Sequence, residues 1–364
     1  VAWVISLISS KMRNKNIITM VVSLLFLAAY FYLYSKMGDI ISGLIANGTA
    51  IAVAFKKYAF PAYYFGVGIA EHNLTYLLLY TVCTLVVFEL VYAILSRSFR
   101  QITTAKKGTA RIKYKERSMH VSSPAAALLR KDFRHFIGNP MYVLNAWMGE
   151  ILLVVACVAM LIKKDILTEF LPILNGEGEI MGLILCVILC GLSCTNLITA
   201  PSISLEGKNL WIAQSIPVPA ATVLRAKVKL QMLLCIPITA LSALLMGIVL
   251  KLELLTLVLA VLVPAAFNLF TALLGVVVNL HFPKFDYINE TVVIKQSMST
   301  MICMFGSMAV VLVLALLYAL LLSASVAPTL FLAVCLVLLV IVCVLMWRYL
   351  GHGGSARFAA LQAD

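Results

Sequence analysis

Eight long runs of apolar residues, each bounded by charges, Pro or Gly, dominate the pattern along the chain. They cover residues 17–36, 74–95, 141–162, 180–200, 228–250, 254–280, 299–322 and 327–347. A helix needs about 20 mostly apolar residues to cross a hydrocarbon core of about 30 Å. Because lipid offers no hydrogen-bond partners, such a segment must also pair its backbone groups internally. The pattern therefore predicts an all-α, polytopic membrane protein with about eight transmembrane helices, forming a single domain over residues 1–364.

The composition supports this class of protein and excludes others. Of the 364 residues, 63% are apolar and only 12% are charged, whereas soluble domains contain about 45–50% and 25%. These proportions exclude an ordinary soluble globule and a disordered chain. All nine cysteines lie inside the predicted spans, which is not the arrangement of a disulfide-linked secreted scaffold.

Three of these cysteines recur at helical spacing. Cys186, Cys190 and Cys194 are four residues apart and share one face of a predicted helix. Such a row could hold a soft metal such as Cu(I). No His or Met pattern accompanies it, and Cys is a small residue that suits helix contacts. We therefore expect packing rather than a metal, and we assign neither a metal nor a cofactor.

Basic residues are divided unequally between the two sides of the predicted membrane. The loops 1–16, 96–140, 201–229, 281–298 and 348–364 hold 22 of the 28 Lys and Arg residues. The opposite side holds six, namely Lys36, Lys56, Lys57, Lys163, Lys164 and Lys251. Since cytoplasmic loops are enriched in Lys and Arg, the basic loops and both termini are predicted to be cytoplasmic. The net charge of +13 favours anionic membrane lipids as partners. The membrane setting and the lack of aromatic interleaving argue against nucleic acid.

The two ends of the first span are unusual. Residues 1–10 form an apolar stub that is too short to span and leads directly into a basic segment. A signal peptide would place its basic residues first. We interpret 1–16 as the inner end of a span that starts upstream, with an interfacial helix as the alternative.

The stretch 37–73 is rich in aromatic residues and suggests short helices in the outer interface, either as anchors or as a lid over an exit path.

The loop 96–140 is too long for a simple connection. Its first part is basic, and its second part begins with Ser123 and Pro124 and ends at Gly138 and Pro140, which are helix start and stop signals. Apolar residues fall on one face of this segment and basic residues on the other. The pattern predicts an amphipathic helix that lies in the membrane interface, or alternatively a solvated basic helix that only fixes topology.

The loop 201–229 also contains more than a connection. After Pro219, a helix can run from Ala220 to Leu250 with Pro237 as its only interruption. These 31 residues span about 46 Å at 1.5 Å per residue, so we expect the helix to protrude into the cytosol. Arg225, Lys227 and Lys229 would then lie at the level of the lipid headgroups. A rigid protrusion with a nearby Trp suits a docking surface, and an ordinary loop with an interfacial Trp is the alternative.

Three segments, taken in order, carry a family resemblance. They are Leu205–Trp211 with Ser215–Pro219, Lys131–Phe136 with Asn139–Asn145, and Phe282–Tyr287 with Asn289–Glu290 and Lys295–Ser297. Together they resemble the bacterial ABC-2-type exporter permeases. This resemblance implies a permease in the bacterial cytoplasmic membrane whose inner loops insert into clefts of cytosolic ABC ATPase subunits. A second copy of the permease is considered as a further partner.

The resemblance implies that a set of residues on two inner loops couples the permease to the ATPase. These residues are Leu205, Glu206, Lys208, Leu210, Trp211, Pro217, Arg225, Phe282, Lys284 and Phe285. The chain itself is not expected to be an enzyme. It contains no Gly-x-x-x-x-Gly-Lys-Ser/Thr phosphate-binding loop and none of the common hydrolase or metalloprotease motifs.

Two carboxylates inside predicted spans are the remaining candidates. Glu89 and Glu150 lie at a depth where a charge is costly, so each is a functional candidate by default. They could share a proton or face a polar pathway, or each could hydrogen-bond to Asn145, Asn196 or Asn268. A proton- or sodium-coupled secondary transporter that uses both residues is therefore the main rival function. A structural or regulatory membrane subunit is the third.

Overall fold

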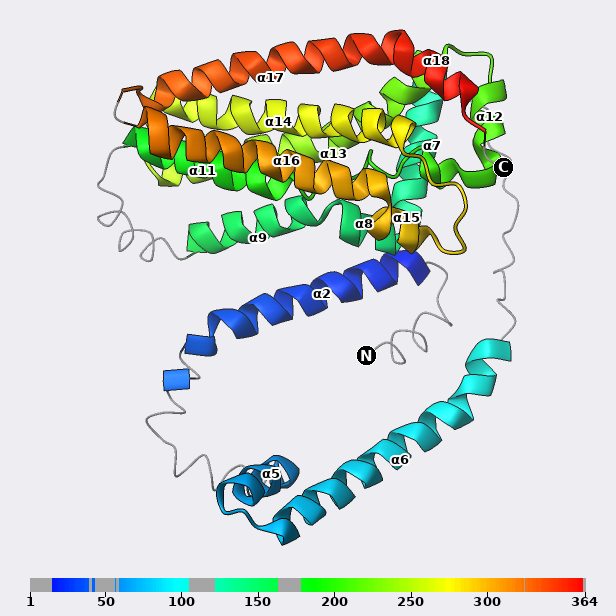
Figure 1. Cartoon of the computed structure of the whole chain (residues 1–364), viewed down its shortest axis with the longest axis vertical. Coiled ribbons are helices and arrows are strands. Elements are labelled where there is room, and N and C mark those ends of the chain that lie inside the picture. Colours follow the sequence, from blue (N-terminus) through cyan, green and yellow to red (C-terminus); the bar gives the residue numbers. More distant parts are fainter. Residues whose placement is uncertain are drawn as a thin grey trace. The chain divides into compact units, whose positions relative to one another are not determined.

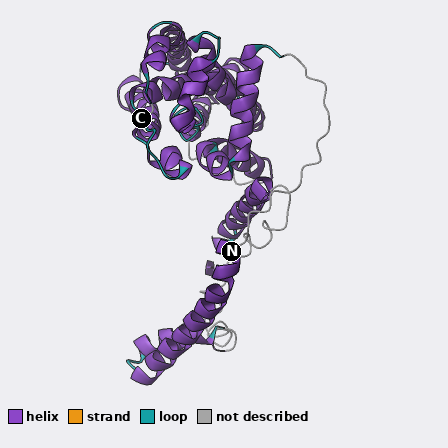
Figure 2. Ribbon diagram, turned by 90° about the vertical axis from the view of Figure 1, so that its right-hand side faces the viewer, coloured by secondary structure: helices purple, strands orange, loops and turns teal. Residues whose placement is uncertain are grey.

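The computed structural model describes residues 15–38, 41–42, 56, 59–104, 122–162, 178–323 and 325–362. These residues form helices and loops and contain no strand (Figure 2). The chain divides into two compact units, one of residues 1–22 with 119–364 and the other of residues 23–118. The single domain over 1–364 stays a prediction. The N-terminal stub, 1–10, lies outside the described residues.

The larger unit is a helical bundle followed by a short C-terminal helix. Its elements are α7 (Pro124–Gly138), α8 (Pro140–Ala146), α9 (Met148–Ile162), α11 (Gly178–Ser193), η2 (Ser204–Asn209), α12 (Leu210–Ser215), α13 (Ala220–Val249), α14 (Leu254–His281), α15 (Glu290–Gln296), α16 (Met298–Leu317), η3 (Tyr318–Leu322), α17 (Pro328–Gly351) and α18 (Gly353–Ala360). The long helices α13, α14, α16 and α17 run side by side with α11 (Figure 1). Helix α7 crosses the end of this bundle near α12 and α18 (Figure 1).

The described residues include five helices that are long and apolar enough to cross a membrane. They are Leu74–Arg97, Ala220–Val249, Leu254–His281, Glu290–Leu321 and Pro328–Gly351. The other three predicted spans fall on shorter apolar helices, Thr19–Tyr34, Met148–Ile162 and Gly178–Ser193. The apolar, all-helical membrane protein is therefore confirmed, and the count of eight spans is not.

Two of the predicted spans are broken, so the prediction of continuous helices over 141–162 and 180–200 was wrong. The first is interrupted at Trp147, between α8 and α9, and the second ends at Ser193. The two breaks lie against each other, because Trp147 and Asn196 form an isolated β-bridge. The backbone N–H of Leu197 donates to the carbonyl of Ala146 at 2.8 Å. Backbone groups released by one break are thus paired by the other, as burial inside a membrane requires.

Small residues allow the helices of the bundle to approach closely. A side chain at Gly182 would meet the Thr256 methyl group at 2.1 Å, and one at Gly275 would meet the Thr199 hydroxyl at 2.1 Å. Cys186 and Cys190 are buried among the apolar side chains of the core beside Cys335. All nine cysteines are free, and no group of three potential metal ligands occurs among the described residues.

The helix boundaries with strong local signals agree with the predictions. Helix α7 begins at Pro124, and the Ser123 hydroxyl accepts a hydrogen bond from the backbone N–H of Ala126. Helix α13 runs for 30 residues from Ala220 to Val249. The apolar face of α7 packs on protein, however, because Leu128 and Phe136 are buried in two clusters of the bundle. The bundle itself thus covers this face, and the position of α7 in the membrane interface stays a prediction.

The smaller unit contains a helical hairpin. Helix α5 (Phe60–Ala70) packs on α6 (Leu74–Thr104), and the tight turn between them holds His72 at a φ of 50°. A side chain at Gly68 would meet Leu77 at 2.9 Å, which shows how close the two helices are. A short helix in the stretch 37–73 was predicted, although much of that stretch lies outside the described residues. The apolar face of α6 is uncovered within this unit, as expected for a helix in lipid.

Candidate functional site

Loop 201–229 is a compact segment at one end of the bundle. It contains η2, α12 and the first turns of α13. The backbone at Gly207 has a φ of 53° and a ψ of −137°, a combination that glycine adopts far more readily than other residues. A side chain there would also lie 2.9 Å from the hydroxyl of Tyr287. Gly207 therefore lets the loop turn sharply against loop 281–298.

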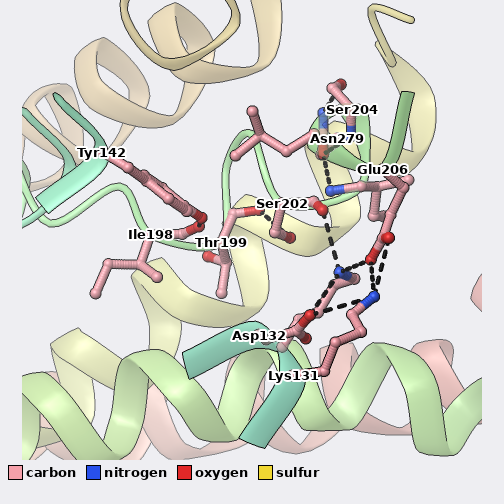
Figure 3. A network of polar contacts seen from close by, with 12 residues as sticks. Lys131, Asp132, Tyr142, Ile198, Thr199, Ser202, Ser204, Glu206 and Asn279 are labelled. Atoms are coloured by element: carbon pink, nitrogen blue, oxygen red, sulfur yellow. Dashed lines mark hydrogen bonds and ion pairs between the residues drawn. The ribbon is translucent and has the colours of Figure 1, made fainter. Parts of the chain in front are cut away.

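Asn279 of α14 fixes the start of this loop. Its buried Oδ1 accepts hydrogen bonds from the backbone N–H groups of Ile203 and Ser204 at 2.8 and 3.1 Å. Its Nδ2 donates to the hydroxyl of Ser204 at 2.7 Å (Figure 3) and to the hydroxyl of Ser299 at 3.1 Å. The Ser204 hydroxyl also accepts from the backbone N–H of Lys284 at 2.9 Å. One side chain thus ties loop 201–229 to α14 and α16, and Ser204 extends the connection to loop 281–298.

Four charged side chains join the loop to α7 and α13. Glu206 Oε1 lies 2.7 Å from the Nζ atoms of both Lys131, on α7, and Lys227, on α13. Asp132 Oδ1 lies 3.6 Å from each of the same two Nζ atoms. Lys227 is only 3% exposed and also donates to the carbonyl of Ser202 at 3.1 Å. These four side chains, Lys131, Asp132, Glu206 and Lys227, form the charge cluster, of which Figure 3 labels the first three.

The charge cluster determines the protonation of Glu206. Burial alone would raise the pKa of its carboxyl, but the positive charges of Lys227 and Lys131 outweigh burial and lower that pKa from 4.5 to about 2. Glu206 is therefore ionised at neutral pH. The ion pairs that join η2 to α7 and α13 depend on this negative charge.

The depressed pKa of Glu206 predicts a pH dependence of stability. The unfolded chain takes up a proton at this carboxyl near pH 4.5, and the folded protein does so only near pH 2. Stability from this group is therefore present above pH 4.5 and is lost as the pH falls towards 2. We expect the thermal midpoint of the detergent-purified protein to fall over this window less steeply in Glu206→Gln than in the wild type. Equal slopes in the two proteins would contradict this assignment.

The predicted coupling residues of loop 201–229 fall into an exposed group and a buried group. Trp211 is 63% exposed, and Lys208 and Pro217 are exposed as well. Leu205 and Leu210 are buried in the clusters beneath the loop. The first group is available to a partner, whereas Leu205 and Leu210 hold the loop on the bundle.

Loop 281–298 divides in the same way. Phe282 and Ile288 expose large apolar side chains. Phe285 is half-buried against the cluster under loop 201–229, and Lys284 is half-buried with its backbone N–H bonded to Ser204. The structure therefore brings Lys284 and Phe285 to loop 201–229, while Phe282 points outward. Ile288 was missed, although an isolated apolar residue in a polar loop is a usable signal.

The basic residues at the start of α13 do not behave as predicted. Lys227 is buried in the charge cluster, and the Arg225 guanidinium lies 4.9 Å above the ring of Trp347. Only Lys229 is exposed. The prediction of a free protrusion, with all three side chains at the level of the lipid headgroups, was therefore wrong. Helices α7 and α18 and the loop itself pack around the start of α13 and remove Lys227 from solvent.

The C-terminal helix α18, which the sequence did not indicate, completes the site. Phe358 is buried in the cluster under loop 201–229. Gln214 of α12 donates to the carbonyls of Phe358 and Leu361 at 2.8 and 3.0 Å. Arg357 Nε donates to the carbonyl of Leu280, at the end of α14, at 2.9 Å. Helix α18 thus fastens α12 to the bundle.

A second set of polar side chains continues the site into the bundle. The Oε1 atom of Gln231, on α13, accepts from the backbone N–H and the hydroxyl of Thr199, both at 3.0 Å. Its Nε2 donates to the carbonyl of Asn196 at 3.0 Å and to the Thr271 hydroxyl at 3.2 Å. Sequence reasoning missed Gln231 and Asn279, and the signal was a polar side chain inside an apolar run. Such residues supply hydrogen-bond partners for the backbone groups of the non-helical segment between α11 and η2.

Glu150 lies deeper in the bundle, at the two helix breaks. It is 1% exposed, and its Oε1 accepts hydrogen bonds from Asn196 Nδ2 and the Thr239 hydroxyl, both at 2.8 Å. Asn268 donates to the same Thr239 hydroxyl at 2.9 Å. Of the partners considered for this carboxylate, the structure thus places Asn196 in direct contact. No hydrogen-bond partner is found for Oε2 among the described residues.

Glu89 belongs to the smaller unit. Its side chain is exposed on α6, among the apolar side chains that cover this helix. Glu89 and Glu150 belong to different compact units, and a proton shared between them stays a prediction.

The comparisons with known proteins identify a family. The family described as "Putative ATP-binding cassette" matches residues 9–348, which include α7, loops 201–229 and 281–298, α13, α14, α16 and most of α17. The comparisons with curated proteins and with solved structures found no match. Because the family match covers most of the 364 residues, this apolar, multi-helical membrane protein belongs to that ATP-binding-cassette family.

Proposed function

We propose that the chain is the membrane permease subunit of an ATP-driven exporter of the ABC-2 type, which moves an unidentified substrate across the bacterial cytoplasmic membrane. ATP hydrolysis would occur in a partner subunit, because the sequence contains no phosphate-binding loop of its own. The family match and the apolar helices support an ABC-related membrane component. In this proposal all eight apolar segments cross the membrane, and the basic loops face the cytoplasm.

One observation carries the proposal: loop 201–229 is exposed at its tip and rigidly held at its base. Trp211 offers a large apolar surface of the kind that anchors interfaces. The charge cluster and Asn279 join the same loop to α7, α13 and α14. A movement imposed at Trp211 would therefore reach three helices of the bundle rather than bend a free loop. This is the mechanical requirement for coupling an ATPase to a permease.

Photo-crosslinking in cells that express the whole operon tests the proposal. Photoreactive residues replace Trp211 and Ile288, which are exposed on the two inner loops, and Lys251, which is exposed at the other end of the bundle. We expect capture of a cytosolic ATPase subunit at positions 211 and 288 and none at 251. Capture at neither loop position would overturn the docking assignment and the exporter with it.

A proton-coupled transporter is the second candidate, and buried Glu150 is the observation that favours it. Glu150→Gln keeps the shape of the side chain and retains an acceptor for Asn196 and Thr239. If ATP is the energy source, substrate-stimulated ATPase activity of the assembled complex should stay within about twofold of the wild type in Glu150→Gln, and equally in Glu89→Gln. Loss of transport together with loss of its proton dependence would support the secondary transporter instead.

A further inference from the structure

A groove runs between α14 and α17 on the side of the bundle and ends at the same end as loop 201–229. Its volume is about 260 Å³, close to the lower limit of about 300 Å³ for small-molecule sites. The apolar lining comes from Ala266, Leu269 and Leu273 on α14 and from Cys343, Val344 and Trp347 on α17. The spacing of three to four residues places each set on one face of its helix.

One arginine lines the end of this groove, and a second contacts its lining from α13. Arg348 is part of its lining and is exposed, and the guanidinium of Arg225 lies 4.9 Å above the Trp347 ring. Among the described residues, neither arginine forms an ion pair, although Lys131, Lys227 and His135 do. The buried Nε of Arg225 has no hydrogen-bond acceptor in the described part of the chain. A buried donor without an acceptor is costly, so this position favours an anion.

We infer that this groove binds an anionic glycerophospholipid. One acyl chain lies against the apolar lining, and the phosphate accepts hydrogen bonds from Arg225 and Arg348. Guanidinium groups match phosphate oxygens well, and Trp is enriched at the depth where chain meets headgroup. A zwitterionic lipid would fit less well, because its headgroup ammonium would bring a positive charge towards two arginines that have no ion-pair partner among the described residues. The bound lipid would join α13, α14 and α17, and this inference does not depend on the nature of the transported substrate.

Native mass spectrometry of the purified full chain in detergent tests this inference. The probes are phosphatidylglycerol, phosphatidylcholine with the same acyl chains, and inorganic phosphate. We expect phosphatidylglycerol to bind about fivefold or more tightly than phosphatidylcholine. We also expect Arg348→Gln to lower the affinity for phosphatidylglycerol about fivefold, which corresponds to the roughly 1 kcal/mol of one basic residue at an anionic surface.

Groove-filling variants provide the second arm. Val344→Trp places a large ring in the groove from a half-exposed rim position, so it should fold and still exclude the lipid. Val258→Phe, at an exposed position elsewhere on α14, and Lys251→Gln, at the other end of the bundle, are the matched controls and should bind as the wild type.

Four results would overturn the inference. The first is equal affinity for both lipids. The second is unchanged lipid binding in both Arg348→Gln and Val344→Trp. The third is binding of inorganic phosphate with no retained lipid, which would show an anion site without an acyl-chain groove. A change of oligomer mass in Val344→Trp with normal lipid binding would assign the groove to a second copy of the chain and would also overturn it.

Discussion

Glu206→Gln is expected to lower the free energy of unfolding by about 3 kcal/mol and to uncouple loop 201–229 from α7 and α13. Glu206 lies 2.7 Å from both Lys131 and Lys227, and Lys227 is 3% exposed. Removing one partner of a buried ion pair typically costs 3–5 kcal/mol, because the remaining charge stays buried without compensation. Asp132 remains 3.6 Å from Lys227, which places the expected loss at the lower end of that range.

Thermal unfolding of the purified protein at pH 7 measures this effect. Lys208→Gln is the matched control, because Lys208 is an exposed charge two positions away and its loss should change stability by less than about 0.5 kcal/mol. The double variant Glu206→Gln with Lys227→Met should recover much of the loss, since replacing both partners avoids an isolated buried charge. Wild-type stability in Glu206→Gln alone would show that the charge cluster does not hold the loop.

Under the proposed function, Trp211→Ala is expected to weaken binding of a partner ATPase about thirtyfold without unfolding this protein. Truncating an aromatic interface anchor typically costs 2 kcal/mol or more, and 2 kcal/mol corresponds to roughly a factor of thirty in affinity. The side chain is 63% exposed, so little of the fold depends on it. Titration of the proposed ATPase partner against this protein measures the affinity, and unfolding of the protein alone should be unchanged.

Two control variants separate docking from folding. Leu233→Ala removes a side chain that is 60% exposed on the membrane-spanning part of α13, and it should leave ATPase binding unchanged. Leu210→Ala removes a side chain that is 1% exposed next to Trp211, and it should lower stability by about 2–5 kcal/mol. If Trp211→Ala binds the ATPase with wild-type affinity, the partner does not dock on this loop.

Polar residues inside apolar runs explain why the site was only partly predictable. Gln231, Asn268 and Asn279 lie in segments whose hydropathy indicates plain membrane helices. In the structure they pair with backbone groups and side chains of the non-helical segment after α11 and of the start of η2. The sequence shows that such residues need partners, because an unpaired polar group is costly in an apolar interior. It does not show which of the many possible partners comes within reach.

The sequence by itself determined the class of protein, the positions of the long helices and the ends of α7 and α13. These features depend on local properties: the apolar content of about 20 consecutive residues, and caps such as Ser123 and Pro124. Only the tertiary structure decided the breaks at Trp147 and after Ser193, the burial of Lys227 and the anchoring role of α18. Each of these requires a partner that is distant in sequence, such as Glu206, 21 residues from Lys227. Hydropathy assigns a lysine to water or headgroups, and a pair of carboxylates from two other elements makes its burial favourable here.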